Sequence, residues 1–288
     1  MSNNSVIIKR VWKDNFDAEM RIIRERTMID HPFISLTTRL VLCSGRIPMG
    51  NEWGNSDDNY ARLLEIEDMF TNIVQVGVAL CDKLGRLPRC NETGRPCIWE
   101  FNLMPLDESA NNPKIMEIFL DRFCSGVKVE QLRSQGIHPE RMAAELWHCS
   151  SLMKEEISWV VFKGGLDFAV LLRWTKQGAQ GLPVEQKEFF KLLAHYFPVF
   201  YDMAAVIGFD PTADDGTIDI SAKSINVGRE DVPPYGAASD SLLALQMFMR
   251  IKMSKKGCAL LEKKASVLYG ITSEQEANAV PTFNNTGL

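Results

Sequence analysis

Three stretches of the sequence decide what fold and what chemistry to expect: GAASDSLL at 236–243, VFKGGLDF at 161–168 and FISLTTRL at 33–40. The first two each set one aspartate, Asp240 and Asp167, in a small or apolar run where a carboxylate could reach a metal ion or a phosphate. The third has the pattern of the strand that should supply two more carboxylates. It contains none, so the capacity of this chain to hold paired cations depends on that stretch.

Composition is that of an ordinary globular protein. The chain has 288 residues, 45% apolar and 24% charged, with a net charge of −5. That length suits one large α/β domain or two small ones. No apolar run is long enough for a membrane span, and the first residues lack a secretory signal pattern, so we expect an intracellular protein. A negative net charge argues against a general nucleic-acid coat protein, because such proteins neutralise phosphates with basic residues. Bound divalent cations could still supply positive charge locally.

The seven cysteines are scattered and odd in number, and the four histidines form no ligand-spaced pair. We therefore expect free, mostly buried thiols in a reducing compartment and no structural zinc.

Periodicity predicts a mixed sheet covered by helices, an α/β fold in one domain. Apolar alternation predicts strands at 33–42, 73–80, 97–103, 157–162 and 199–202. Helical spacing predicts helices at 16–24, capped by Asp14-Asn15, and at 60–70, 166–174, 183–193, 218–227 and 239–251, with several more between 112 and 153 and a loop at 44–60. Beyond Ile271 apolar content falls, which predicts a disordered tail over 272–288.

The strand at 33–42 is the critical one, because residues two apart share a face. Thr37 and Arg39 point away from the apolar side of Leu36 and Leu40. A two-metal phosphodiesterase needs bridging carboxylates there, and a hydroxyl and a permanently cationic guanidinium cannot replace them. Taken singly, Asp167 and Asp240 are more typical of a helix cap or dipole partner than of a metal ligand, and Asp202 is compatible with a strand-end residue or a cap.

These stretches, in this order, resemble the poly(A)-specific deadenylases of the Ccr-associated-factor (Caf/Pop) family, which are catalytic subunits of the Ccr–Not complex. Within that family the sequence most resembles plant members. The resemblance runs from about Val6 to Ile271. Besides the stretches already quoted, the segments that carry it are 6–15, 73–78, 98–102, 159–162, 201–202 and 267–270.

The resemblance implies a ribonuclease-H-like DEDD exonuclease fold, in which four acids hold two Mg²⁺ or Mn²⁺ ions and a histidine helps to activate water. Two of the family's acids are retained as Asp167 and Asp240. The other two fall on Thr37 and Arg39, and the histidine falls on Tyr235. The implied partners are the Ccr–Not scaffold, the Ccr-type nuclease and poly(A) RNA. Neither DNA nor a membrane is an implied partner. The implied location is the nucleus and the cytoplasm.

Three hypotheses follow for the function. The first is a family subunit in messenger-RNA turnover with weak or no catalysis and poor metal binding, in which Arg39 lies between Asp167 and Asp240 as their counter-charge or has merely drifted. The second is an active Mg- or Mn-dependent 3′–5′ poly(A) exoribonuclease with replacement ligands such as Asp202 or a backbone carbonyl. The third is a non-hydrolytic RNA binder whose Arg39 and Lys163 contact phosphates.

Overall fold

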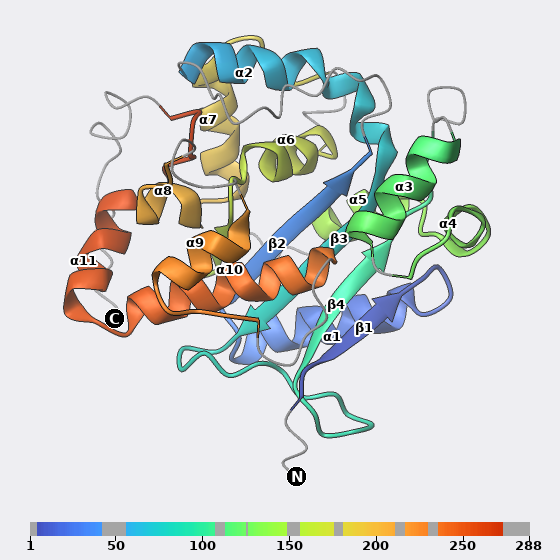
Figure 1. Cartoon of the computed structure of the whole chain (residues 1–288), viewed down its shortest axis with the longest axis horizontal. Helices are drawn as coiled ribbons and strands as arrows, with labels where there is room; N and C mark the ends of the chain where they lie inside the picture. Colours follow the sequence, from blue (N-terminus) through green and yellow to red (C-terminus); the bar gives the residue numbers. More distant parts are fainter. Residues whose placement is uncertain are drawn as a thin grey trace.

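A six-stranded mixed sheet forms the centre of the molecule (Figure 1). The computed structural model describes residues 5–41, 56–106, 113–124, 126–148, 156–175, 181–210, 217–229 and 236–272. The strands are β1 (Ile7–Val11), β2 (Phe33–Leu40), β3 (Ile73–Cys81), β4 (Cys97–Asn102), β5 (Ser158–Val161) and β6 (Phe200–Asp202), and they lie in the order β1-β4-β3-β2-β5-β6.

Strand directions confirm the predicted mixed sheet. The consecutive strands β2, β3 and β4 are antiparallel neighbours, whereas β1 runs parallel to β4, β5 to β2 and β6 to β5. As a result β2, β5 and β6 end at the same edge of the sheet. The carboxyl ends of such strands are where α/β proteins commonly build their sites.

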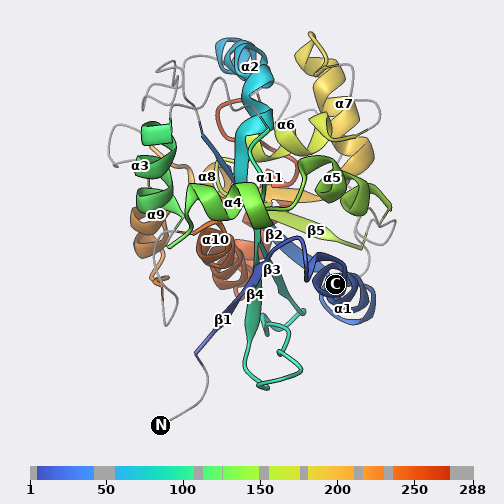
Figure 2. The ribbon, with the colours of Figure 1, turned by 90° about the vertical axis from the view of Figure 1, so that its right-hand side faces the viewer.

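Helices cover both faces of this sheet (Figures 1 and 2). Their bounds are α1 (Phe16–Ile29), α2 (Ser56–Glu65), the 3₁₀ helix η1 (Glu67–Asn72), α3 (Pro113–Phe123), α4 (Val129–Gln135), α5 (Pro139–His148), α6 (Gly165–Arg173), α7 (Gln186–Tyr196), α8 (Met203–Ile207), α9 (Ile218–Ser224), α10 (Ala237–Lys252) and α11 (Lys255–Lys264). None of the described helices is long and apolar enough to cross a bilayer.

Alternation along the strands separates two apolar cores. Phe33 faces the core beneath α10, together with Leu242, whereas Leu36 faces the opposite core, where Phe168 of α6 packs. Because side chains alternate along a strand, Arg39 shares the α10 face with Phe33, and Thr38 shares the α6 face with Leu36. The two retained acids are therefore approached from opposite sides of β2.

Most predicted elements form, with differences at their ends. The predicted helix at 60–70 begins earlier, as α2, and ends in η1. Asn15 precedes α1, but its side chain accepts a hydrogen bond from Trp12 N–H at 2.8 Å rather than capping the helix. The sequence reading missed β1, α8 and α11. Most of the predicted 44–60 loop and residues 273–288 of the predicted tail lie outside the described residues.

The described cysteines are free, as predicted. Four of them, Cys81, Cys90, Cys97 and Cys124, are buried, and Cys258 is half-buried. Burial is usual for free cysteines that are scattered through apolar segments.

Candidate functional site

Asp240 lies in the first turn of α10, where both of its carboxylate oxygens are taken by arginines. The guanidinium of Arg39 on β2 pairs with Oδ2, and that of Arg229 pairs with Oδ1. The side chains of Arg39, Asp240 and Arg229 are only 18%, 14% and 11% exposed. Pairs so shielded from water interact more strongly than surface ion pairs.

Arg229 extends this ion pair to α9. Its Nε and Nη2 donate to the two carboxylate oxygens of Asp219 at 2.7 and 2.9 Å, a bidentate contact, and its Nη1 donates to Ser239 Oγ at 2.5 Å. Sequence reasoning did not single out either Arg229 or Asp219. No spacing rule would have found them, because Asp219 lies in the first turn of α9 and Arg229 follows that helix, and only the packing of α9 beside α10 brings Arg229 to Asp240.

Asp167 is held by a different residue of β2. Its Oδ1 accepts hydrogen bonds from both the backbone N–H and the hydroxyl of Thr38, each at 2.6 Å. The carboxyl group is buried. Burial raises its pKa to about 6, while the Thr38 donors and the charge of Arg39 act in the opposite direction.

Arg39 therefore touches one retained acid and not the other. It pairs directly with Asp240, whereas on Asp167 it acts only through its charge. The counter-charge hypothesis describes Asp240 correctly, but the direct partner of Asp167 is Thr38. The drift alternative, in which Arg39 extends into solvent, is wrong for this geometry, because the guanidinium is mostly buried against Asp240.

The remaining family positions offer no carboxylate. Thr37 pairs with Gly77 of β3 in the sheet, and Tyr235 lies outside the described residues.

The carboxylate of Asp202, the suggested replacement ligand, accepts hydrogen bonds from backbone N–H groups. This residue ends β6 and is fully buried. Oδ1 accepts from the N–H groups of Lys163 and Ala204 at 2.8 and 3.1 Å, and Oδ2 accepts from those of Gly164 and Tyr269 at 3.0 and 3.1 Å. Burial raises its pKa, and these four donors act against that rise. A cation could bind only by displacing them.

Lys163 also has a local role that differs from phosphate contact. It adopts a left-handed backbone with φ of 55°. Its ammonium lies 3.9 Å from the ring centroid of Phe209, with Phe162 and Tyr269 within 6.0 Å. A cation over aromatic faces is stabilised where it is, so moving it to a phosphate would forfeit that interaction.

The N-terminus of α10 is capped by side chains of the sheet. Gly77 allows this close approach, because a Cβ there would lie 2.0 Å from the carbonyl carbon of Ala237. Gln75 Oε1 accepts from Ala237 N–H at 3.3 Å, and the carboxylate of Glu100 accepts from Ala238 N–H. This role of Glu100 was not predicted from the sequence. Burial raises the pKa of its carboxyl group.

These residues do not fit a pair of divalent cations. Within the described part of the chain, no three His, Cys, Asp or Glu side chains gather closely enough to hold a metal ion. The oxygens of Asp240 face two guanidinium groups, and Oδ1 of Asp167 is hydrogen-bonded twice. Two-metal catalysis requires bridging anionic oxygens where this structure has Arg39.

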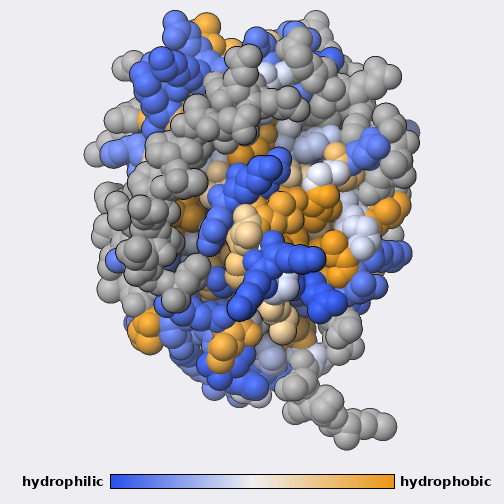
Figure 3. Space-filling model, turned by 90° about the vertical axis from the view of Figure 1, so that its left-hand side faces the viewer, coloured by the Kyte–Doolittle hydropathy of each residue, from blue (hydrophilic) through white to orange (hydrophobic). Residues whose placement is uncertain are grey.

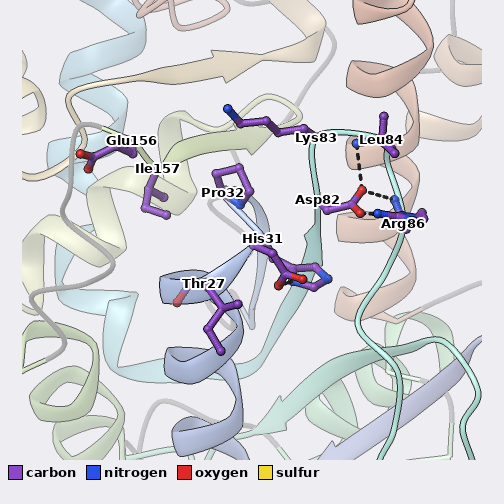
Figure 4. Close-up of a pocket in the computed structure, with 11 residues that line it drawn as sticks. Thr27, His31, Pro32, Asp82, Lys83, Leu84, Arg86, Glu156 and Ile157 are labelled. Carbon is purple, nitrogen blue, oxygen red and sulfur yellow. Dashed lines mark hydrogen bonds and ion pairs between the residues drawn. The ribbon is translucent and has the colours of Figure 1, made fainter. Parts of the chain in front are cut away.

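A separate cavity of about 560 Å³ lies at the opposite end of β2 (Figure 4). It is lined by the end of α1, the turn after β3 and the entry to β5. His31 and Asp30 pair with each other beside it, and Arg86 pairs with Asp82. Asp82 also accepts hydrogen bonds from the N–H groups of Leu84 and Arg86 at 2.8 and 2.9 Å.

The chain is similar to known proteins over nearly its whole length. No family model matches it. Probable CCR4-associated factor 1 homologs 7 and 10 of Arabidopsis thaliana are 30% and 31% identical, over 95% of this chain and 96% and 95% of theirs. Poly(A) ribonuclease pop2 of Schizosaccharomyces pombe is 30% identical over 92% of this chain and 75% of its own length.

Solved structures agree with the fold. The Mg²⁺- and Mn²⁺-bound form of S. pombe Pop2p has a TM-score of 0.73 and 28% identity, over 91% of this chain and 99% of that one. Yeast CAF1, co-crystallized with the NOT1 MIF4G domain, has a TM-score of 0.71 at 20% identity over 93% and 99% of the two chains. The ribonuclease-H-like fold expected from the sequence is confirmed.

Proposed function

This chain belongs to the family of the CCR4-associated factor 1 homologs and Pop2, and from that premise we propose that it is a Ccr–Not subunit of deadenylase type with weak or no catalysis. It would act in messenger-RNA turnover as a scaffold or competitor, as one domain spanning residues 6–271, in the nucleus and cytoplasm. The observation that carries the proposal is the pairing of both Asp240 oxygens with Arg39 and Arg229.

The physical argument is electrostatic. A two-metal site brings about four positive charges among carboxylates that would otherwise repel one another. Here guanidinium groups supply that positive charge, and two of the four family acids are absent. A divalent ion approaching Asp240 would have to displace a charge-assisted hydrogen bond and would meet repulsion from Arg39.

Assembly is the role that the family relationship supports. A yeast relative was co-crystallized with the NOT1 MIF4G domain, and this chain covers nearly all of that relative's length. A member that keeps the fold without the cations could occupy the same place in the complex.

The alternative of an active exoribonuclease needs replacement ligands. Of the two candidates, Asp202 and a backbone carbonyl, Asp202 is opposed by its four backbone donors.

The test has two measurements on the purified chain. Calorimetric titration with Mn²⁺ should show no tight uptake, and oligoadenylate with a free 3′ end should release no adenylate with Mg²⁺ or Mn²⁺. Tight uptake of two ions would overturn the argument that the site cannot hold them, and adenylate release that Asp167→Ala abolishes would establish the active alternative. Binding to a purified NOT1 MIF4G domain tests the scaffold role, and its absence would remove that part of the proposal.

A further inference from the structure

The end of α10 and all of α11 carry a concentration of positive charge. Residues 241–272 contain six basic residues and one acid, Glu262, a local balance of +5. Since the whole chain has a net charge of −5, the remainder carries −10. The six residues, which we call the basic corner, are Arg250, Lys252, Lys255, Lys256, Lys263 and Lys264.

These cations share one corner of the molecule because α11 follows α10 after a short turn. Gly257 marks the contact, since a Cβ there would lie 1.8 Å from the carbonyl oxygen of Ile251. The first turn of α11 therefore meets the last turn of α10. Lys256 and Lys263 are two helical turns apart, so they project from the same side of α11 about 10 Å from each other.

Helix electrostatics explains only part of the basic corner. Arg250 and Lys252 end α10, and Lys263 and Lys264 end α11, where cations are favourable. Lys255 and Lys256 occupy the first turn of α11, where cations are unfavourable and acids are usual. A departure from a local rule is expected where a surface serves a function.

The charges of the basic corner are not neutralised internally. Within the described residues none of the six forms an ion pair with a carboxylate, in contrast to Arg39 and Arg229. Lys252 lies over the ring of Phe33, 5.4 Å from its centroid, so the other five cations carry the charge that is available to a ligand. Lys255, Lys256 and Lys263 are exposed. The corner lies on the side of the molecule that faces the viewer in Figure 3, where hydrophilic side chains surround apolar ones.

We propose that the basic corner binds the phosphate backbone of single-stranded RNA, independently of sequence and of divalent cations. Five of its six cations are lysines, which act as point charges suited to phosphates rather than as bidentate readers of bases. Met253, 80% exposed between the two helices, offers a polarizable side chain to a base. Lys252 follows Asp240 by twelve residues of α10, about 18 Å away, so this surface is separate from the neutralised site.

Fluorescence anisotropy with a labelled oligoadenylate of about 20 nucleotides in EDTA tests the proposal. We expect the quadruple variant K255Q/K256Q/K263Q/K264Q to bind at least about tenfold more weakly at about 100 mM salt. Its slope of log affinity against log salt should be shallower by up to about 3, because about 0.7 is lost per phosphate contact on a single strand. Oligouridylate should bind the parent chain with similar affinity.

The matched control is K83Q/K128Q/K187Q/K223Q, which removes four other exposed lysines and changes the net charge equally. It should bind within about twofold of the parent chain. Equal losses in both variants, or no binding by the parent chain, would overturn the proposal. So would displacement of the RNA by polyglutamate at equal charge concentration, which would assign the corner to an acidic protein segment. Because EDTA removes divalent ions, the result does not depend on whether the chain hydrolyses RNA.

Discussion

Arg39 and Asp240, which are 201 residues apart in the sequence, form an ion pair between strand β2 and the first turn of helix α10. In a two-metal nuclease of this fold, cations would join the same two elements. The pair thus joins strand and helix by a salt bridge, which is the interaction that carries the proposed function.

The ion pair should contribute measurably to stability. Replacing Arg39 with Met removes the guanidinium but keeps an apolar stem, and leaves Asp240 with Arg229 alone. We expect the free energy of unfolding to fall by about 1–3 kcal/mol, less than for a fully buried pair because both groups retain some exposure. Urea denaturation of R39M, D240N and the double variant measures the coupling energy. A coupling near zero would contradict a direct interaction.

Restoring acids to β2 should make stability depend on metal. The double variant Thr37→Asp/Arg39→Glu places two carboxylates near Asp240 and Asp167, which repel one another without cations. In EDTA its melting temperature should lie below that of the parent chain. A saturating excess of Mn²⁺ should then raise it by about 5–10 °C.

The parent chain is the control for this reversal. Its melting temperature should be the same in EDTA and in Mn²⁺, because Arg39 occupies the position that the ions would need. A shift of several degrees in the parent chain would show that it binds divalent ions after all.

Asp167→Asn should remove a pH dependence. The pKa of Asp167 is about 6 in the folded chain, above the ordinary value of about 3.9 in an unfolded chain. The folded state therefore binds the proton more tightly, and the stability that this group contributes falls as pH rises from about 4 to about 6. The asparagine can still accept both Thr38 hydrogen bonds.

We therefore expect D167N to match the parent chain near pH 4 and to exceed it above pH 7, by up to about 3 kcal/mol. Thermal unfolding across this pH range measures the difference. If D167N were less stable than the parent chain at pH 8, the charged form would be favoured by its surroundings, against this prediction.

Removing the carboxylate of Asp202 should be among the most damaging single changes. Asp202→Ala would leave four backbone N–H groups without their acceptor. Each buried, unsatisfied donor costs about 1–3 kcal/mol, so the loss should exceed about 3 kcal/mol even if water satisfies some of them. Glu188→Ala, at an exposed ion pair on α7, serves as the control and should change stability by less than about 1 kcal/mol.

Gly77→Ala should displace α10. The added methyl group would lie 2.0–2.2 Å from backbone atoms of Ala237 and Ala238, a contact that side-chain rotation cannot relieve. Overpacking of this kind costs about 1–3 kcal/mol or more. Hydrogen exchange of the first-turn amides of α10 should speed up, because the caps from Gln75 and Glu100 depend on the close approach. Unchanged protection of the Ala238 amide would show that the helix is held some other way.

Strong apolar patterns made several elements predictable, and weak ones did not. Alternation located β2, and a continuous apolar run located the fully buried strand β3. The edge strand β1 is mostly half-exposed and has little alternation. Helix α8 has only five residues and follows β6 directly, so no helical period develops.

In the candidate site too, some features were predictable from the sequence and others were not. The residue types alone establish that β2 lacks carboxylates at Thr37 and Arg39, and that Asp167 and Asp240 remain. Which partner each acid takes was not predictable. Thr38 reaches Asp167 and Arg39 reaches Asp240 because neighbouring residues of a strand point to opposite faces, against different helices.

By itself, then, the sequence determined the family, the mixed α/β sheet and the absence of carboxylates at Thr37 and Arg39, because these depend on local pattern and on the presence or absence of a functional group. Only the tertiary structure decided that Arg229 and Asp219 join the ion cluster, that Asp202 is fully occupied by backbone donors, and that the first turn of α11 packs against the end of α10 at Gly257. Each of these depends on contacts between segments far apart in the chain, whose geometry is set by packing of the whole core rather than by any one stretch.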